Sequence, residues 1–514
     1  MEIRHISLPS LSAPPATPAR GTTPALEVEL DLLGLLCHDD TLSSDPLVQE
    51  ADASLRGLLL ATAADERFLA HAGQTLSLHT RGDLPSRRLV LIGAGPSPTL
   101  TTGAARVAAG RFARAAAAAG ARQVGLVLPA SAPADAASDP ALRLQAAVEG
   151  LLLGLYRFDK YLDSSKRNPP AVHTATFFSP LPSAQADVAI QRAKETARAV
   201  ANARNLVNEP AAFLTPRRLA ETAEQLAREN ALDAVVLGRA ACQEKGMGLF
   251  LAVAQGSAEE PQFIHLAWKP PGARRRVVLI GKGVTFDSGG LSLKTNEGML
   301  DMKVDMSGAA AVLSSIEAIA RQKLPVEVHA LAACTENMPS GTAYKLGDVL
   351  RSMNGKTVEI TNTDAEGRLT LADALTYGLA LKPDFILDFA TLTGACVVAL
   401  GPHIAGAMGN DDALLAQWLR AAKEAGEEMW PLPLPPRLAE QLKSEIADLK
   451  NTGERWGGAL TAGLFLKEFV DGTPWVHVDL AGPASTDKEL GHVAKGGTGF
   501  GVATIVQFVR TLAN

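Results

Sequence analysis

The chain has 514 residues and a formal net charge of −6, with 47% hydrophobic and 20% charged residues, an ordinary composition for a soluble globular protein. Its length exceeds the usual size of one hydrophobic core and therefore predicts two domains. The acidic balance argues against a general nucleic-acid or anionic-membrane surface, no apolar run is long enough to span a bilayer, and the four widely spaced cysteines are typical of reduced thiols in a cytoplasmic protein.

The first half of the chain predicts a smaller α/β domain over residues 1–185. Its beginning, through about Ala25, is rich in Pro, Thr and Ala and lacks the apolar core of a secretory signal, so we expect a frayed or partly ordered, flexible leader there. The strands expected in this domain are 26–36, 88–93 and 123–128, and the helices are 104–119 and 142–156. No cluster of chemically active residues stands out among them.

A Gly-Ala-Gly-Pro sequence ends the second of these strands, at 93–96. Pro96 and the missing third glycine depart from the dinucleotide-binding fingerprint. A simple turn is therefore the better interpretation of this glycine pair.

A long amphipathic helix is expected at 188–207, within a connector segment that spans 186–214. From residue 215 to 514, helices alternate with strands, which predicts a larger C-terminal domain with a mostly parallel central sheet flanked by helices. In such folds the ligand lies beyond the carboxyl ends of the strands. The expected strands are 234–237, 263–268, 276–280, 326–333, 384–389 and 475–480, and the expected helices are 216–229, 307–322, 373–381 and 501–512.

Charged side chains collect in three segments of the second half, each just after a strand or at a helix start. The segments are 281–294, 303–308 and the octapeptide 362–369, which follows a short strand-like run at 358–360. In a parallel sheet these turns converge at one end. The convergent set is four carboxylates, two lysines and an arginine: Asp287, Asp305, Asp364, Glu366, Lys282, Lys294 and Arg368.

Four carboxylates in a water-poor pocket repel one another, and two divalent cations would balance their charge. Metal ions about 3.5–4 Å apart activate a water molecule and polarise the bond that it attacks. Lys294 and Arg368 would then remain to stabilise the developing oxyanion, and Gly367 would allow a sharp turn at the site. The alternative is a structural ion-pair network without metal.

Two competing motifs have weaker support. The Asp-Ser-Gly-Gly sequence at 287–290 looks like the nucleophile loop of chymotrypsin-like serine proteases, but the α/β context does not fit that fold. His477 and Asp479 lie on one face of a strand, where a buried structural histidine is a better interpretation than a metal ligand. No pair of histidines has the HExxH spacing, which disfavours a histidine-ligated zinc protease.

With these residues laid out, the second half resembles the leucine aminopeptidase family, also called the cytosol aminopeptidases. The resemblance is strong from about Arg204 to the C-terminus and weak before it. The matching segments are 278–291, 305–310, 336–341, 362–369 and 390–395.

The resemblance implies a hydrolase, specifically a leucyl aminopeptidase-type metalloprotease that releases leucine-like and other N-terminal amino acids from peptides. It implies two divalent metal ions per subunit, Mn²⁺ or Zn²⁺ with Co²⁺ or Mg²⁺ as alternatives, and a metal-bridging water as nucleophile. One metal would be held by Lys282, Asp287, Asp305 and Glu366, and the other by Asp287, Asp364 and Glu366.

The resemblance also implies roles outside the metal-ligand set. Lys294 would stabilise the gem-diolate, and Arg368 would hold a bicarbonate that acts as general base. The pocket for the first side chain would be lined by Met302, Thr391, Gly394 and Ala481. A homohexamer is implied as well.

The sequence departs from the family pattern after the connector helix, where Pro210 is followed by two alanines instead of an Ala-Asn or Ser-Asn pair. That puts a local contact in doubt, not the metal site. An additional DNA-binding or regulatory role is the alternative function, because some members of the family bind DNA. Here only Arg106, Arg111 and Arg114 offer a local basic patch.

Overall fold

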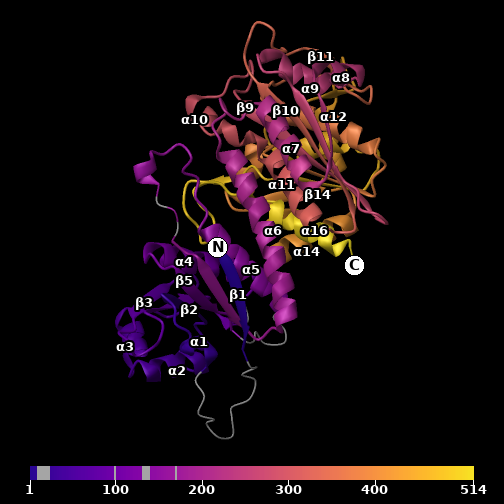
Figure 1. Cartoon of the computed structure of the whole chain (residues 1–514). Helices are drawn as coiled ribbons and strands as arrows, with labels where there is room; N and C mark the ends of the chain where they lie inside the picture. Colours follow the sequence, from indigo (N-terminus) through magenta and orange to yellow (C-terminus); the bar gives the residue numbers. More distant parts are fainter. Residues whose placement is uncertain (9–22, 98–99, 130–138, 168, 170, 514) are drawn as a thin grey trace. The chain divides into compact units, whose positions relative to one another are not determined.

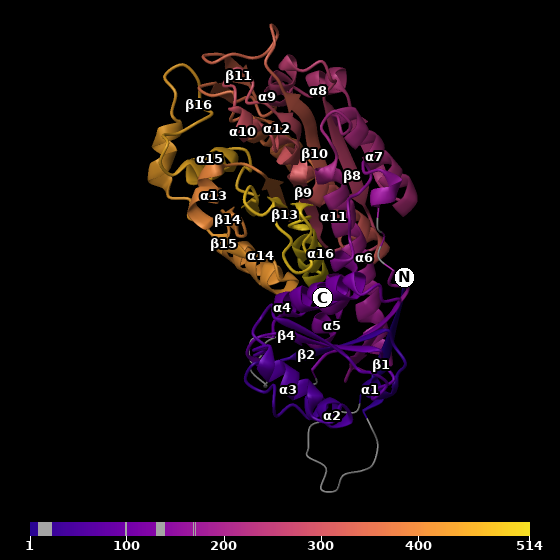
Figure 2. The ribbon, with the colours of Figure 1, turned by 90° about the vertical axis from the view of Figure 1, so that its left-hand side faces the viewer.

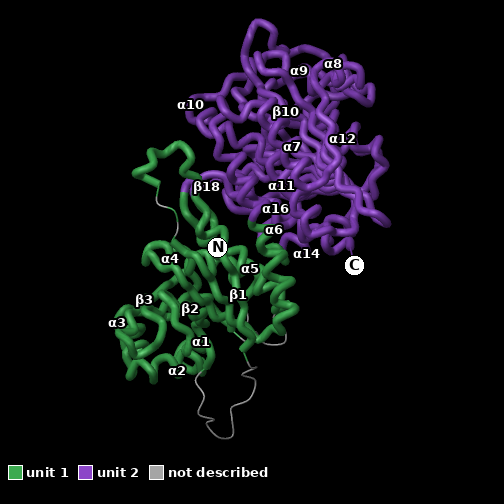
Figure 3. Tube along the Cα trace, in the orientation of Figure 1, with its two compact units in different colours: residues 1–197, 424–426, 488–494 green, residues 198–423, 427–487, 495–514 purple. Residues whose placement is uncertain are grey.

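The computed structural model describes residues 1–8, 23–97, 100–129, 139–167, 169 and 171–513, which form two compact units (Figures 1 and 3). The first unit comprises Met1–Ala197, Glu424–Gly426 and Lys488–Ala494; the second comprises Arg198–Lys423, Glu427–Asp487 and Lys495–Asn514. The division falls inside the helix α6 (Ser183–Asn208), which contains the amphipathic segment expected at 188–207. The proposed domain boundaries at 185 and 214 stay a prediction.

The first unit is a six-stranded sheet with helices on both faces. Its strand order is β1-β6-β5-β2-β4-β3, and every neighbouring pair is parallel except β3 with β4. One face packs against α4, α5 and the start of α6, and the other against α1, α2 and α3 (Figure 2). The elements are β1 (Glu2–Ser7), β2 (Leu32–Cys37), β3 (Thr75–His79), β4 (Arg88–Gly93), β5 (Gln123–Val127), β6 (Thr174–Ser179), α1 (Pro24–Glu27), α2 (Pro46–Ser54), α3 (Leu58–Asp65), α4 (Thr102–Ala118) and α5 (Pro140–Gly154).

Part of the segment expected to be a frayed or partly ordered leader, through about Ala25, is ordered. Residues Glu2–Ser7 form the edge strand β1, paired in parallel with β6, and α1 begins at Pro24. Backbone hydrogen bonds to a neighbouring strand order a segment whose side chains alone give only a weak strand signal. The rest of that leader, residues 9–22, lies outside the described residues.

The second unit contains an eight-stranded sheet in the order β15-β14-β17-β13-β9-β10-β8-β7. Its four central strands β17, β13, β9 and β10 are parallel, whereas β8, β7 and β14 run antiparallel to their inner neighbours. The α/β fold with mostly parallel sheets flanked by helices is therefore confirmed. The strands are β7 (Asp233–Leu237), β8 (Gln262–Trp268), β9 (Arg276–Asp287), β10 (Glu327–Asn337), β13 (Phe385–Ala390), β14 (Ala405–Gly409), β15 (Met429–Pro431) and β17 (Trp475–Asp479).

Helices cover both faces of this sheet (Figure 1). On one face α9, α12 and α15 bury their apolar side chains against β9, β10, β13 and β17, and on the other α11 lies along β9, β10 and β13 with α16 beside it. The helices are α7 (Pro216–Asn230), α8 (Arg239–Glu244), α9 (Gly248–Val253), α10 (Asn296–Met299), α11 (Ser307–Arg321), α12 (Gly367–Leu379), α13 (Gly394–Leu400), α14 (Asp412–Ala425), α15 (Gly458–Lys467) and α16 (Val502–Thr511).

Two expectations about the strands near the site are corrected. The strand expected at 276–280 continues to Asp287, so Lys282 lies inside β9 and not in a loop behind it. The run before the octapeptide is β12 (Thr357–Glu359), which belongs to a separate small sheet with β11 (Val349–Arg351) and β16 (Leu449–Lys450). The octapeptide thus does not follow a strand of the main sheet.

Candidate functional site

Strand β9 supplies the first two charged residues of the site, Lys282 and Asp287. Side chains alternate along a strand, so residues five apart would ordinarily point to opposite faces. The pairing of β9 with β10 shifts register after Val284, because Thr285 is an extra residue opposite the Thr335/Glu336 step. Such a bulge reverses the alternation and allows both charges to face one side.

The third carboxylate, Asp305, lies in the short 3-10 helix Met302–Met306 directly before α11. Its Oδ1 atom accepts a hydrogen bond of 2.7 Å from the Thr391 hydroxyl. Gly308 allows this helix entrance to lie against the sheet, since a Cβ there would come within 2.0 Å of the Phe389 carbonyl oxygen. This close contact between the backbones of the helix entrance and the sheet thus fixes how near Asp305 lies to the sheet.

The octapeptide delivers Glu366 and Arg368 through the start of α12, where Glu366 is the N-cap and Arg368 the second helical residue. Gly367 is helical and makes no sharp turn, which corrects the expectation for it. A Cβ at this position would lie 2.6 Å from Lys282 Cε. The glycine is needed for the close approach of the lysine side chain.

The structure brings the predicted charges together in two groups. Around Lys282, the Nζ atom lies 2.7 Å from both Asp305 Oδ2 and Glu366 Oε1. Around Lys294, the Nζ atom lies 2.9 Å from Asp287 Oδ2 and also contacts Asp364 Oδ1.

Three carboxylates taken from both groups also lie close to one another. Oxygen atoms of Asp287, Asp364 and Glu366 all lie within 4.8 Å of one another, which is compatible with a shared cation.

Burial has the largest effect on the pKa values of these carboxylates, and the neighbouring lysines oppose it. Burial raises the pKa of Asp305 well above its usual value, with Lys282 opposing the shift, and burial also raises the pKa of Asp364. Burial lowers the pKa of Lys282 and Lys294, but the surrounding carboxylates outweigh it and raise both above the ordinary lysine value. The ionised carboxylates of the cluster therefore need positive charge next to them to be stable.

The same residues test the metal hypothesis against the alternative ion-pair network. Asp305 Oδ2 and Glu366 Oε1 are close to Lys282 Nζ, yet neither has a hydrogen bond of acceptable geometry. Buried oxygens that face a cation without directed hydrogen bonds fit ligation of a metal ion better than a finished hydrogen-bonded network. The donor set of carboxylates and one amine fits Mn²⁺ or Zn²⁺.

Arg368 is buried but stands apart from the carboxylates. Its Nη1 donates to the Asn451 carbonyl at 2.7 Å, and its Nε has no hydrogen-bond partner. Burial lowers its pKa to about 10, although Glu366 and Asp479 oppose the shift. Among the residues that the structure describes, no carboxylate forms an ion pair with it, so the guanidinium is available to an external anion.

Of the four residues expected to line the pocket, Thr391 contacts this cluster directly. Thr391 contacts Asp305 as described, and its carbonyl accepts a hydrogen bond of 3.2 Å from Lys282. The backbone N–H of Ala481 donates to Asp479 Oδ1 at 3.3 Å, and Gly394 begins α13 with open space where a Cβ would stand. Met302 opens the 3-10 helix of Asp305. Their role as pocket lining stays a prediction.

The histidine of the competing motif is structural. His477 Nδ1 lies 2.6 Å from Asp388 Oδ1, and both side chains are fully buried. Burial lowers the pKa of His477, but Asp388 outweighs it and raises the pKa overall. Asp479 accepts a hydrogen bond of 2.6 Å from the Thr393 hydroxyl instead of facing a metal.

The glycine pair at 93–96 is a turn, as expected. The N–H groups of Ala94 and Gly95 donate to the carbonyls of Cys37 and Ala70, and the Ser97 N–H donates to Asp40. These donors are therefore engaged within the chain and do not form a phosphate-binding loop.

Three buried residues that the sequence analysis did not assign to the site also contact it. Asn337 and Tyr344 hold the octapeptide through its Thr363 carbonyl, and Asn451 holds it through Asn362. Only Asn337 lay in a segment that the resemblance had matched. Uncharged amides and hydroxyls carry no charge pattern, so no signal in the sequence distinguishes them from other buried polar residues.

Comparison with known proteins decides the family. Residues 201–506 match the model of the cytosol aminopeptidase family, catalytic domain, and residues 34–165 match that of its N-terminal domain. The chain belongs to the cytosol aminopeptidase family. Like the family, it is a peptidase of the aminopeptidase class, and the predicted resemblance is confirmed.

Relatives of the family match over nearly the whole chain. A probable cytosol aminopeptidase of Cyanothece sp. is 44% identical over 490 residues, covering 95% of this chain and 98% of the relative. One of Geobacter sp. is 42% identical over 495 residues, covering 96% and 98%.

Solved structures of the family agree. A mutant of tomato leucine aminopeptidase superposes with a TM-score of 0.88 at 35% identity, covering 99% of this chain and 96% of that one. The bottromycin maturation enzyme BotP, in complex with Mn, gives a TM-score of 0.82 at 37% identity, covering 94% of this chain and 100% of that one.

Among the helices that the structure describes, none combines the length and the apolar character needed to cross a bilayer.

Proposed function

We propose that this member of the family is a dinuclear metal-dependent aminopeptidase that releases leucine-like and other N-terminal residues from peptides. The observation that supports it most is the close approach of Asp287, Asp364 and Glu366 beside the buried Lys282–Asp305 pair. The manganese complex of the similar enzyme BotP supports Mn²⁺ as one resident ion.

The residues would divide between two ions. Lys282, Asp287, Asp305 and Glu366 would hold one, and Asp287, Asp364 and Glu366 the other. A pair of divalent ions, when bound, polarises the scissile carbonyl and lowers the pKa of a water molecule. Lys282 must be neutral in that role, which neighbouring cations favour by lowering its pKa.

Lys294 and Arg368 supply the remaining chemistry from the chain itself. The Lys294 amine contacts Asp287 and Asp364, so its charge lies where an oxyanion beside these two carboxylates would be stabilised. Arg368, buried without a carboxylate partner, would bind bicarbonate, a base that accepts a proton during hydrolysis.

Chelation tests the proposal. We expect that removing metal from the purified chain abolishes hydrolysis of leucine p-nitroanilide, and that Mn²⁺, Zn²⁺ or Co²⁺ restores it. Full activity in a thoroughly demetallated sample would overturn the proposal. The family resemblance also leads us to propose assembly as a homohexamer and a cytoplasmic location. Size-exclusion chromatography with light scattering tests the homohexamer.

The alternative, a DNA-binding role, receives no support from the three arginines considered for it. Arg106 is buried against Glu149, with 2.6 Å between Nη2 and Oε2, whereas Arg111 donates to the Gly73 carbonyl and Arg114 to that of Gly491. All three are engaged within the first unit.

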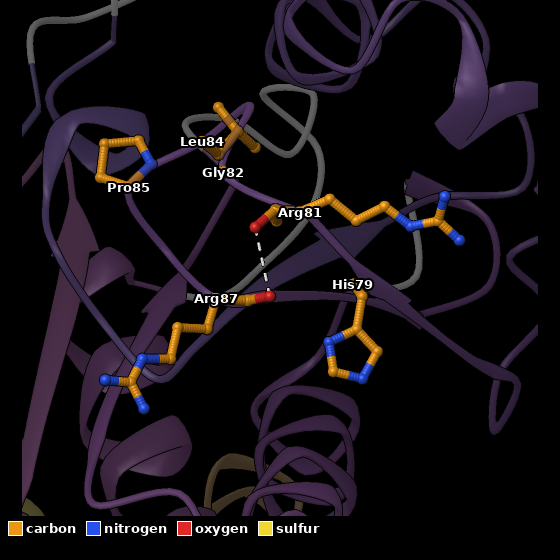
Figure 4. A pocket seen from close by; sticks show the side chains of 7 residues that line it. His79, Arg81, Gly82, Leu84, Pro85 and Arg87 are labelled. Atoms are coloured by element: carbon orange, nitrogen blue, oxygen red, sulfur yellow. Dashed lines mark hydrogen bonds between the residues drawn. The ribbon is translucent and has the colours of Figure 1, made fainter.

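A basic pocket of about 380 Å³ in the first unit is another place to look for an anion. Figure 4 shows its two arginines, Arg81 and Arg87, extending in opposite directions, with His79 between them. They do not converge on one point, and Arg87 lies 3.7 Å from Asp31. A gel shift that detects salt-dependent retention of DNA would revive this alternative.

A further inference from the structure

Asn337, the last residue of β10, links two segments that carry the proposed metal ligands. Its side chain is fully buried, with 0% exposure. The amide Nδ2 donates two hydrogen bonds, one of 2.8 Å to Asp287 Oδ1 and one of 3.0 Å to the Thr363 carbonyl. A single rigid NH₂ group thus sets the spacing between the end of β9 and the octapeptide.

The bond to Asp287 decides which of its oxygens faces the cluster. Oδ1 also accepts the Gly289 N–H at 2.8 Å, so this atom is saturated by two donors. Oδ2 is left on the side of Lys294, at 2.9 Å. Asn337 therefore holds the carboxylate in one orientation, with one oxygen turned toward the other acidic side chains.

The bond to Thr363 fixes the residue immediately before Asp364. The Thr363 carbonyl also accepts the Tyr344 hydroxyl at 2.8 Å, and its own hydroxyl donates to the Gly289 carbonyl at 2.7 Å. Since Asp364 follows directly, the position of its carboxylate depends on these bonds.

We infer that Asn337 is a positioning residue that holds Asp287 and Asp364 at the separation needed to share one cation. The inference rests on the proposed function and deepens it. Hydrogen bonds to metal-binding side chains orient them and typically change metal affinity or activity by about 10–100-fold.

Asn451 provides a matched comparison on the other side of the octapeptide. It is also fully buried, donates from Nδ2 to the Asn362 carbonyl at 2.7 Å, and accepts at Oδ1 from the Thr361 N–H at 2.9 Å. Its backbone carbonyl, however, accepts the hydrogen bond from Arg368, and its side chain contacts none of the carboxylates. Loss of its side chain keeps this carbonyl but frees the backbone that carries it, so we expect the position of Arg368 to loosen while the carboxylates keep their direct contacts.

The test compares Asn337→Leu with Asn451→Leu, because leucine has the same branched shape and number of heavy atoms as asparagine and removes the hydrogen bonds. The demetallated full-length proteins are titrated with Mn²⁺ by calorimetry, and thermal unfolding is recorded alongside. We expect Asn337→Leu to weaken Mn²⁺ binding by about 10–100-fold. Asn451→Leu should leave Mn²⁺ affinity unchanged and lower kcat for leucine p-nitroanilide at saturating Mn²⁺.

Unchanged Mn²⁺ affinity in Asn337→Leu would overturn the inference, as would equal weakening in both variants, which would indicate a general loss of stability. If Asn337→Leu does not fold, Asn337→Ser, whose hydroxyl donates one bond, takes its place with the same expected order. Absence of both Mn²⁺ binding and peptide hydrolysis in the unmodified protein would instead overturn the proposed function, and the inference with it.

Discussion

At the scale of one residue, Lys282 shows how neighbouring carboxylates stabilise a buried charge in the site. Its ammonium contacts Asp305 and Glu366 at 2.7 Å, and these charges raise its pKa although burial acts in the opposite direction. The lysine therefore serves as the counter-charge of the cluster until cations replace its proton. Gly367 makes this position possible, because any side chain there would collide with the lysine.

Gly367→Ala tests that close approach. Alanine is favoured over glycine in a helix by roughly 1 kcal/mol, so the fold should persist, but the new methyl group must displace the Lys282 amine. We expect peptidase activity to fall by at least about tenfold with little change in Tm. Gly341→Ala, whose Cβ would meet open space, is the control. Undiminished activity in Gly367→Ala would show that the position of the lysine is unimportant.

Lys294→Ala separates oxyanion stabilisation from metal binding. The variant loses a positive charge next to Asp287 and Asp364 but none of the proposed ligands, so metal content should stay the same. Loss of one oxyanion donor predicts a kcat about 10²–10³-fold lower. Elemental analysis and steady-state kinetics measure the two effects, with Lys356→Ala, a lysine paired with Glu468, as control. Release of metal from Lys294→Ala would contradict the role assigned to it.

At the scale of the element, the bulge in β9 and the start of α12 explain what the sequence did and did not predict. The apolar run before Gly281 predicted a strand, and the charged residues that follow it predicted which side chains lie together at the site. The extra residue Thr285 was not predictable, because a bulge depends on the pairing partner β10 and not on local composition. Nor did the octapeptide predict that Arg368 belongs to a helix, since Asp and Gly are typical of turns.

A hydrogen-bonded histidine pair on β8 and β10 predicts a pH-dependent stability. His265 Nε2 lies 2.9 Å from His329 Nδ1, which leaves room for one proton between them. Burial lowers the pKa of His265 to about 4 and also lowers that of His329. Since the unfolded chain takes up protons near pH 6.5 and the folded chain does not, this contribution is present above that pH and is lost as pH falls toward 4.

For His265 the loss amounts to on the order of 3 kcal/mol once the pH is below 4, and to about 2 kcal/mol at pH 5. Urea unfolding of His265→Gln at pH 8 and pH 5 measures it: the variant should lose less stability between the two conditions than the unmodified chain. The exposed His79→Gln should behave like the unmodified chain. An equal loss in all three proteins would rule out the histidine pair as its source.

At the scale of the whole molecule, the alternation of helices and strands predicted two α/β parts and the order of most elements of the second unit. Strand β1 was missed, since Glu2–Ser7 mixes polar and apolar residues and is ordered by pairing with β6 at the sheet edge. Side chains distant in sequence complete the site, Asn337 and Asn451 among them, and only the tertiary structure reveals their hydrogen bonds. The charged residues of the site were predictable as a group, because four carboxylates that meet in a buried place require positive charge beside them.

The dinuclear site is tested by determining the metal-to-protein ratio and the peptidase activity on the same sample as Mn²⁺ is returned to the demetallated chain, with Asp364→Ala in parallel. We expect activity to rise with metal content to a limit of about two ions per chain. Asp364→Ala should bind less metal and lose nearly all turnover. Full activity at a negligible metal content, or normal activity in Asp364→Ala, would contradict the proposed dinuclear metal site.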